Sequence, residues 1–438
     1  YLYISIRKRR SFLMEISKPC VLFCAVCITL LISYISWHPA SQLLLGSSDS
    51  TIHSEHKTED RFFYGIMLDA GSTGTRIHIY KFSHTAAGLP HLEHETFKAL
   101  KPGLSSYAEN PGKCAAGVNN LLEIAKKEIP EHLHKSTPIV LKATAGLRLL
   151  PGNKAQRLLD EVTELFQGSP FLVEKDRVSI MDGTDEGIFA WITVNFLTGS
   201  FANRAIKHAG MLDLGGGSTQ ITFYPYEKDT FPSAPAGYIS AHKLFNRSYT
   251  LYSHSYLGLG LMSARLAIMG GEEGTPLKPE EQLVTPCLTP GYVTDFHQAG
   301  ITYEVKGQES DLPPFELCSQ RIAKILDQHN IHKIPEVSKQ SFYAFSYYFD
   351  RAVDAQLLDP EHGGSLKVKD FQTAAEKDLK KIPGENPFLC MDLAYITSLL
   401  EKLGFSKDKD LKLASKINEV ETSWALGATF YNMNILNR

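Results

Sequence analysis

A short stretch of glycine, serine and threonine occurs twice in this chain, each time separated from a preceding aspartate by one apolar residue. The first copy is "MLDAGSTGTR", Met67 to Arg76, and the second is "MLDLGGGSTQ", Met211 to Gln220. Apolar and alternating segments flank each copy, which is the pattern of two strands joined by a glycine-rich turn. A motif repeated after a domain-sized interval indicates a duplicated domain, whose two turns would face each other across a cleft.

The remaining pattern favours the α/β class. Helical segments alternate with strands, such as the strand that ends at Thr144, and this alternation is typical of α/β folds. We place the first lobe at 61–208 and the second at 209–424. The final apolar segment, 425–438, is expected to form a helix that packs back onto the first lobe.

The first 60 residues differ in composition from the rest. Basic residues precede the uncharged run Pro19 to Trp37, which is long enough for one transmembrane helix. We predict a cytosolic tail (1–18), a membrane helix (19–37) and a polar stem (38–60), because flanking positive charge stays on the cytosolic side. The rest of the chain would then be lumenal. A cleaved signal peptide is the alternative.

Other residues fit an oxidising compartment. Asn246-Arg247-Ser248 is a glycosylation sequon. Among the four cysteines outside the predicted span, Cys287 and Cys318 are the expected disulfide pair, with buried thiols as the alternative. The formal net charge of −3 argues against a nucleic-acid partner.

The two turns carry groups that can bind a phosphate chain and a metal ion. Consecutive backbone amides in a glycine turn form an anion site. Asp69 and Asp213 would hold a hydrated Mg²⁺ or Ca²⁺ between them, since these ions prefer oxygen ligands. Neither turn has the sequence of a Walker loop. The candidate phosphate-binding residues are Ser72, Thr73, Gly74, Thr75, Arg76, Gly215, Gly216 and Gly217.

A hydrolase also needs a base, and three carboxylates are candidates. Asp182, Asp185 and Glu186 lie together on a turn that enters an apolar helix. One of them could take a proton from attacking water, although acidic residues also stabilise a helix N-terminus by themselves. Gln220 could orient the same water, and Thr144 is expected near the same cleft.

The segment "SFYAFSYYFD", Ser341 to Asp350, is dense in aromatic residues. On a helix, Tyr343, Tyr347 and Phe349 cannot all face the core. One or two of them could stack on a nucleobase, and core packing is the alternative.

These motifs together resemble the ectonucleoside triphosphate diphosphohydrolases, the apyrase family. "DAGSTGTR", "ATAGLR", "GTDEG", "DLGGGSTQ" and "FYAFSYYFD" occur in the family's order, and "FKALKPGLS" and "NFLTG" are most similar to its secretory-pathway nucleoside diphosphatases. The resemblance implies an actin-like (RNase H-type) fold of two lobes, with the active site in the interlobe cleft. It implies metal-dependent hydrolysis of UDP, GDP and IDP, and more weakly of triphosphates, by direct attack of water in a Golgi or other secretory-pathway lumen.

The resemblance also implies roles for individual residues. Glu186 would be the base, and Ser218 with Gln220 would position the water. Thr144 would lie near the metal bound by the two aspartates. The residues implied for the nucleobase are Tyr347, Tyr348 and Phe349.

One departure from the subgroup concerns cysteine. Its members have a second lumenal disulfide that ends at the cysteine of "PFLCMDL", and here that residue is Cys390. The segment ahead of it contains no cysteine, so Cys390 is either free or paired with Cys114.

Two rival functions use the same turns. One is an actin-like kinase or chaperone ATPase, which the predicted lumenal location argues against. The other is a catalytically inactive nucleotide-binding receptor, which the presence of Glu186, Ser218 and Gln220 argues against.

Overall fold

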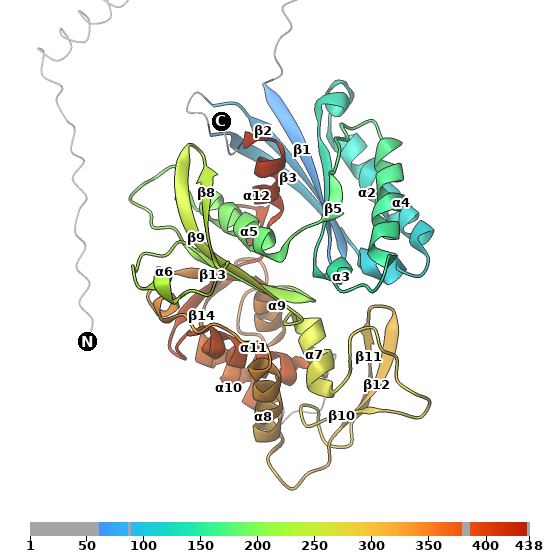
Figure 1. Ribbon diagram of the computed structural model, residues 1–438, viewed down its shortest axis with the longest axis vertical. Helices are drawn as coiled ribbons and strands as arrows, with labels where there is room; N and C mark the ends of the chain where they lie inside the picture. Colours follow the sequence, from blue (N-terminus) through green and yellow to red (C-terminus); the bar gives the residue numbers. More distant parts are fainter. Residues whose placement is uncertain (1–60, 86–88, 379–385, 436–438) are drawn as a thin grey trace, which may run out of the picture. The chain divides into compact units, whose positions relative to one another are not determined.

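The computed structural model describes residues 61–85, 89–378 and 386–435 (Figure 1). The tail, membrane helix and stem predicted for residues 1–60 lie outside the described residues. Within the described ranges, no helix has both the length and the apolar sequence needed to cross a membrane. The description below therefore concerns the part of the chain that contains both glycine turns.

The first lobe is built on a five-stranded sheet. β1 (Phe62–Ala70), β2 (Thr75–Ser83) and β3 (His91–Leu100) are antiparallel neighbours, while β4 (Ile139–Ala143) and β5 (Val178–Ile180) continue the sheet parallel to β1. The strand order is β3-β2-β1-β4-β5. β1 is buried along most of its length, which explains its nearly continuous apolar run.

The second lobe repeats this arrangement around the second glycine turn. Its five central strands are β6 (Gly210–Leu214), β7 (Ser218–Phe223), β9 (Arg247–Leu257), β13 (Phe342–Ser346) and β15 (Asp410–Leu413). They follow the order β9-β7-β6-β13-β15, with the same relative directions as in the first sheet. The edge strands are β8 (Ile239–Leu244) and β14 (Gly364–Lys367). The α/β class and the internal duplication are thus confirmed.

Two apolar helices pack against each other between the sheets. α5 (Gly183–Leu197) covers β6, β7 and β9, whereas α12 (Ala425–Asn432) covers β1 and β2. The helices approach closely, because a Cβ atom at Gly427 would lie 2.1 Å from the backbone oxygen of Phe189. α5 precedes the lobe boundary predicted at residue 208 but packs on the second sheet. By its position in the sequence α5 belongs to the first lobe, whereas by its packing it belongs to the second.

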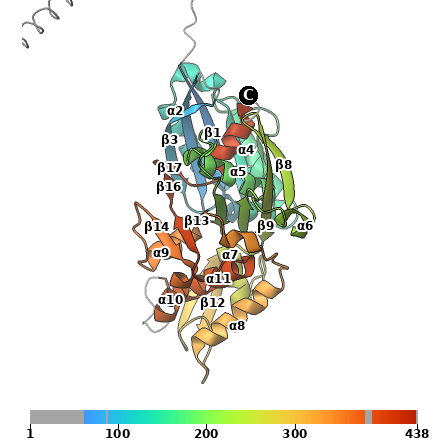
Figure 2. The ribbon, with the colours of Figure 1, turned by 90° about the vertical axis from the view of Figure 1, so that its left-hand side faces the viewer.

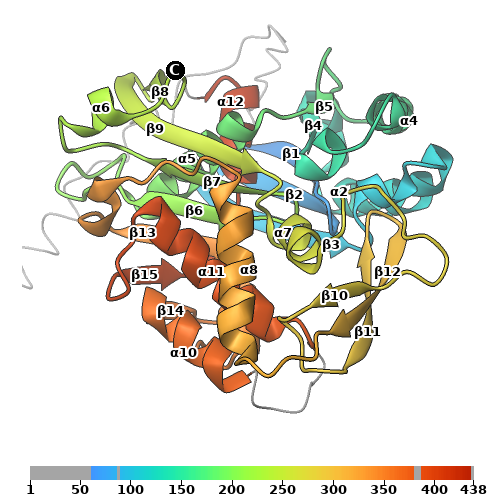
Figure 3. The ribbon, with the colours of Figure 1, turned by 60° about the horizontal axis from the view of Figure 1, so that its bottom comes forward.

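The other helices cover the remaining faces of the sheets. α2 (Ala115–Glu128) and α4 (Lys154–Gln167) cover the first sheet with their apolar sides. On the second lobe, α11 (Leu389–Leu403) packs between α8 (Pro314–Asp327) and α10 (Val368–Asp378) (Figure 3). α11 is buried on nearly all sides, which explains its apolar sequence.

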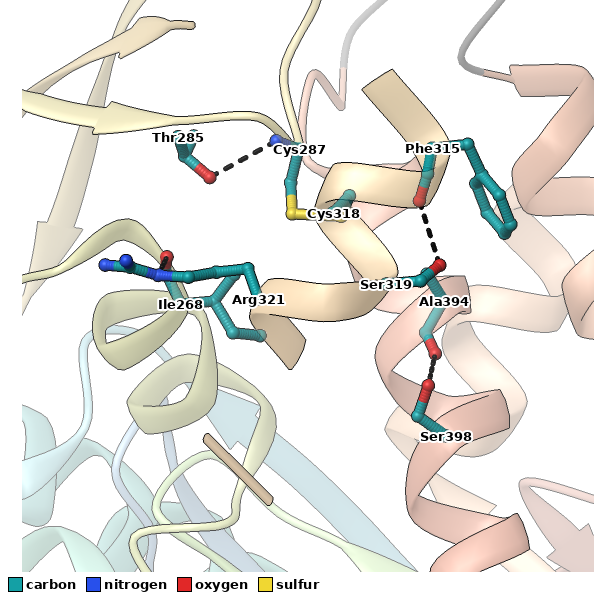
Figure 4. Close-up of a disulfide and its surroundings, with 9 residues drawn as sticks. All are labelled: Ile268, Thr285, Cys287, Phe315, Cys318, Ser319, Arg321, Ala394 and Ser398. Carbon is teal, nitrogen blue, oxygen red and sulfur yellow. Dashed lines mark hydrogen bonds between the residues drawn. A yellow bond between two sulfur atoms is a disulfide. The ribbon is translucent and has the colours of Figure 1, made fainter. Parts of the chain in front are cut away.

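A small three-stranded sheet extends the second lobe and is tied to it by a disulfide. Its strands are β10 (Leu283–Thr285), β11 (Val293–Gln298) and β12 (Ile301–Gly307). The predicted Cys287–Cys318 pair is confirmed, and it joins the segment after β10 to α8 (Figure 4). Closing a loop of this length stabilises a fold by roughly 3–4 kcal/mol.

Cys114 and Cys390 are buried in different hydrophobic cores, so they do not pair with each other.

The connection from β15 to α12 crosses from the second lobe to the first. It forms a short hairpin, β16 (Lys416–Ile417) and β17 (Val420–Glu421), which lies beside β3 (Figure 2). The backbone N–H of Glu421 donates to Oε2 of Glu95 on β3 over 2.6 Å. Asn418 Nδ2 donates to the backbone oxygen of Leu197 at the end of α5 over 2.8 Å. The crossing segment is thereby attached to both β3 and α5.

Candidate active site

A cavity of about 480 Å³ is lined by both glycine turns. The turns close in the same way, because the amides of Gly71 and Gly215 each donate to the carbonyl three residues further on, over 3.0 Å. The two turns are also in direct contact, since a Cβ atom at Gly216 would lie 2.0 Å from Ser72 Oγ. The duplicated motif thus produces two matching walls of one cavity.

Asp69 and Asp213 occupy equivalent positions near the ends of β1 and β6, and both line the cavity. Arg76 Nη1 donates to Asp69 Oδ2 over 2.8 Å. The Oδ1 atoms of both aspartates are buried and have no partner among the described residues. Burial, reinforced by the charge of Asp69, raises the pKa of Asp213 to about 6. Two carboxylates that line one cavity, each with a buried oxygen that no hydrogen bond satisfies, fit a hydrated divalent cation.

Within the described residues, no group of three or more His, Cys, Asp or Glu side chains is arranged to bind a metal ion. The binding of a cation through water by Asp69 and Asp213 stays a prediction.

Glu186 lies in the first turn of α5 and is the one member of the predicted acidic trio that lines the cavity. Asp182 is the N-cap of α5, where its Oδ1 accepts a hydrogen bond from the amide of Thr184 over 2.7 Å. The side chains of Asp182 and Asp185 are exposed. Of the three candidates for the base, the geometry brings Glu186 alone to the site.

A hydrogen-bonded set of side chains surrounds Glu186. Arg148 Nη2 pairs with Glu186 Oε2, and Gln220 Nε2 lies 3.4 Å from the same oxygen. Gln220 Nε2 also donates to Ser218 Oγ over 2.7 Å and to Ser255 Oγ over 2.9 Å. Burial raises the pKa of Glu186 to about 8, although the charge of Arg148 opposes this shift. Only the ionised fraction of such a carboxyl group can accept a proton, and this fraction grows as the pH rises through its pKa.

Most of the predicted phosphate-binding residues line the cavity, but two do not. The lining members are Ser72, Thr73, Arg76, Gly215, Gly216 and Gly217. Thr75 is buried on the face of β2 opposite to its neighbour Arg76, because successive side chains of a strand alternate between faces. Gly74 faces the backbone oxygen of Leu100 instead. Gly74 and Thr75 therefore do not line the cavity with their side-chain positions, and the role of their backbone amides in phosphate binding stays a prediction.

Thr144 lies at the junction of β4 and α3 (Ala145–Arg148), where it lines the cavity. Its amide donates to the carbonyl of Ala70 over 3.2 Å. This bond ties the junction to the start of the first glycine turn, so Thr144 lines the same cavity as Asp69.

The aromatic segment does not form one helix, so the expectation of a continuous helix is wrong. β13 ends at Ser346, whose φ of 56° lies in the left-handed region, and α9 (Tyr347–Asp354) begins directly after it. Tyr347 and Phe349 line the cavity. Tyr348 is fully buried in the core of the second lobe and does not reach the cavity.

Sequence reasoning missed several residues that line the cavity. They are Lys101, Arg265, Asp350, Arg351, Glu421 and Trp424. Arg265 lies on α7 (Leu261–Met269), within the segment "YLGLGLMSAR". An isolated arginine in an apolar helix was the available signal, because a buried charge requires a partner.

Asn246 of the sequon lies in the turn between β8 and β9, and Arg247 and Ser248 begin β9. Asn246 is exposed and adopts a left-handed φ of 60°. A side chain exposed on a hairpin turn is accessible to modification.

Comparison with known proteins identifies the class to which this fold and site belong. The chain matches the GDA1/CD39 (nucleoside phosphatase) family over residues 53–438, so it belongs to that family, and the predicted resemblance is confirmed. It is 55% identical to human ectonucleoside triphosphate diphosphohydrolase 6 over 379 residues, which cover 86% of this chain and 78% of that protein. It is 49% identical to human nucleoside diphosphate phosphatase ENTPD5 over 378 residues, which cover 85% of this chain and 88% of that protein.

A solved structure supports the fold. The nucleoside triphosphate hydrolase of Neospora caninum matches with a TM-score of 0.61 and 15% identity, over 95% of this chain and 96% of that one. At this identity the likeness concerns the two-lobe α/β architecture alone.

Proposed function

We propose that this protein hydrolyses the terminal phosphate of nucleoside diphosphates, with a preference for UDP, GDP and IDP and weaker action on triphosphates. The observation that carries the proposal is the bonded set Glu186, Gln220 and Ser218 beside a cavity bounded by two glycine turns. The name of the human relative described as a nucleoside diphosphate phosphatase supports the same substrate class. We assign the duplicated strand order to an actin-like (RNase H-type) scaffold.

In the proposed reaction, water attacks the terminal phosphorus in line with the leaving oxygen. Glu186 accepts the proton of this water. Gln220 donates to Ser218 Oγ, so the Ser218 hydroxyl hydrogen remains available for the water or the phosphate. The amides of the two turns and the guanidinium of Arg76 stabilise negative charge on the phosphoryl oxygens.

The proposed cofactor is Mg²⁺ or Ca²⁺, held through water by Asp69 and Asp213 with Thr144 nearby. When bound, the cation supplies positive charge that neutralises phosphate oxygens. Arg76 Nη1 donates to Oδ2 of Asp69, whereas the Oδ1 atoms of Asp69 and Asp213 have no hydrogen-bond partner among the described residues.

We further propose a single-pass membrane protein with its catalytic part in the lumen of the Golgi or another secretory compartment. The disulfide Cys287–Cys318 and the exposed sequon at Asn246 support this placement. A soluble form would arise if the stem is cut. Asn246→Gln should increase gel mobility of the protein made in secretory cells, and an unchanged mobility would speak against glycosylation at this site.

A phosphate-release panel tests the proposed function. The full chain is assayed with nucleoside mono-, di- and triphosphates in the presence of Mg²⁺, Ca²⁺ or a chelator, with Glu186→Gln as the matched inactive control. The proposal expects the highest kcat/KM for diphosphates and no turnover with chelator. Turnover of triphosphates alone, or transfer of phosphate to an acceptor without release, would contradict it.

A further inference from the structure

Polar side chains of the second lobe line the cavity beside the predicted base-stacking residue. Tyr347, Asp350 and Arg351 are spaced i, i+3 and i+4 on α9, so they lie on neighbouring positions of one helix face. All three line the cavity, as does Arg265 from α7. These residues come from helices behind the second sheet, whereas the phosphate-binding candidates come from the two turns.

One buried carboxylate holds both arginines. Asp392 of α11 is fully buried. Arg265 donates to both of its oxygens, through Nε to Oδ1 over 2.6 Å and through Nη2 to Oδ2, while Arg351 Nη1 lies 3.4 Å from Oδ2. The guanidinium of Arg351 lies 5.3 Å from the ring centroid of Tyr347. The hydrogen bond to Asp392 and the contact with the Tyr347 ring hold the Arg351 side chain in position before a ligand binds.

The two guanidinium groups have more donors than these partners use. Each has five N–H groups and no acceptor. Arg265 uses two of them on Asp392, and Arg351 contacts Asp392 and Asp354 with one terminal nitrogen each. Arg351 Nε is buried without a partner among the described residues. Because Arg265 and Arg351 both line the cavity, this wall presents guanidinium groups next to the exposed carboxylate of Asp350.

Nucleobases differ in the hydrogen-bonding groups on the edge that would face these side chains. Uracil, guanine and hypoxanthine carry a carbonyl beside a ring N–H. Cytosine and adenine carry an amino group beside an unprotonated ring nitrogen. An arginine can donate to the carbonyl and a carboxylate can accept from the ring N–H. With cytosine or adenine, the arginine N–H groups would face the amino group of the base, which is also a donor. The carboxylate would face the unprotonated ring nitrogen, which is also an acceptor. Both contacts leave polar groups without a hydrogen-bond partner.

We propose that Arg265, Arg351 and Asp350 select bases with a carbonyl beside a ring N–H, and that Asp392 is the positioning residue that holds both arginines. The inference rests on the proposed hydrolysis of nucleoside diphosphates and assigns its base selectivity to particular side chains. Tyr347 contributes stacking, which is similar for all bases and therefore gives affinity without selectivity.

Asp350→Asn is the sharpest test, because it replaces an acceptor by a group of the same size that also donates, at an exposed position where folding is unaffected. The kcat/KM ratios of UDP to CDP and of GDP to ADP are measured. The wild type should favour UDP and GDP, and the variant should narrow both ratios by about tenfold. Asp327→Asn is the matched control, since Asp327 is exposed and pairs with Lys402 outside the cavity.

Arg351→Met and Asp392→Asn test the role of the arginine N–H donors in the same assay. Both variants should narrow the kcat/KM ratios of UDP to CDP and of GDP to ADP. Asp392→Asn leaves two arginines without their shared carboxylate, so its folding is checked first by circular dichroism; if it does not fold, Asp350→Asn and Arg351→Met decide. Ribose 5-diphosphate has no base, so Asp350→Asn should lose less kcat/KM on it than on UDP or GDP. Unchanged base ratios in Asp350→Asn, or an equal loss on ribose 5-diphosphate, would overturn the inference.

A binding measurement separates this inference from the proposed reaction. Glu186→Gln binds nucleotide without turnover if Glu186 acts as the base, so calorimetry can compare UDP with CDP in Glu186→Gln and in Glu186→Gln/Asp350→Asn. Tighter binding of UDP that is lost in the double variant supports the inference even if diphosphates are poor substrates. Equal affinities for UDP and CDP in Glu186→Gln would overturn it, whatever the wild type hydrolyses.

Discussion

Gly216 in the second turn faces the hydroxyl group of Ser72 in the first turn, with no room for a side chain between them. A Cβ atom at Gly216 would lie 2.0 Å from Ser72 Oγ but 3.2 Å from Ser72 Cβ. The hydroxyl can rotate about the Cα–Cβ bond, so an added methyl group would turn it away from its present position without separating the lobes.

Gly216→Ala should therefore lower kcat/KM by about tenfold while thermal stability stays close to that of the wild type, because a hydrogen bond to a charged phosphate is lost. Ser72→Ala should have an effect of similar size. The double variant should be no worse than either single one, since both remove the same hydroxyl contact. Steady-state kinetics of the four proteins check this expectation, and additive losses would contradict it.

Glu186→Gln keeps the shape of the side chain and removes the proton acceptor. We expect kcat to fall by about 10²–10⁴, while the nucleotide still binds through amides, hydroxyls and metal. Asp182→Asn is the control, because Asp182 caps α5 and its side chain is exposed. Kinetics and calorimetry on both variants decide the question. A Glu186→Gln enzyme that retains more than about a tenth of wild-type kcat would remove Glu186 from the role of base.

The pH dependence follows from the environment of Glu186. A general base acts as the carboxylate, whose fraction grows as pH rises through its pKa. Burial raises this pKa to about 8 and Arg148 opposes the shift, so kcat/KM should rise with pH across the neutral range. Arg148→Met removes the opposing charge and should move the rise to higher pH. Profiles of both enzymes at the same saturating cation concentration test this sign, and a shift to lower pH would refute it.

Asp213→Ala should weaken the metal dependence and lower activity, because the cation loses one of its two carboxylates. The concentration of Mg²⁺ that gives half-maximal activity should rise by about tenfold or more. Asp410→Ala, which removes an exposed carboxylate outside the cavity, is a suitable control. If Asp213→Ala shows full activity and an unchanged metal titration, Asp213 does not belong to the metal site.

The repeated turn could be recognised from sequence because it is a local pattern that occurs twice. Asp69 and Asp213 come together for the same reason, since each is the penultimate residue of the equivalent strand of the duplicated unit. The choice among Asp182, Asp185 and Glu186 could not be made from the residues alone. Only the direction of α5 relative to the turns shows that Glu186 faces the cavity, and here the family resemblance supplied what the local pattern lacked.

Two other features of the site had no local pattern. The change from strand to helix at Ser346 decides that Tyr347 lines the cavity and Tyr348 fills the core, and no propensity fixes that single residue. The ion pair of Arg265 with Asp392 joins residues 127 positions apart. Such a pair exists only once the chain has folded, so one sequence alone does not reveal it.

The duplication makes the catalytic cavity equivalent to the interface of a dimer whose two subunits are joined in one polypeptide. Each half supplies one turn and one aspartate, so neither half alone contains a complete site. α5 belongs to the first half by sequence, but it buries its apolar surface on the sheet of the second half. If two chains exchanged this helix, each cavity would receive its Glu186 from the other chain, and the exchange would yield a domain-swapped dimer with two complete sites.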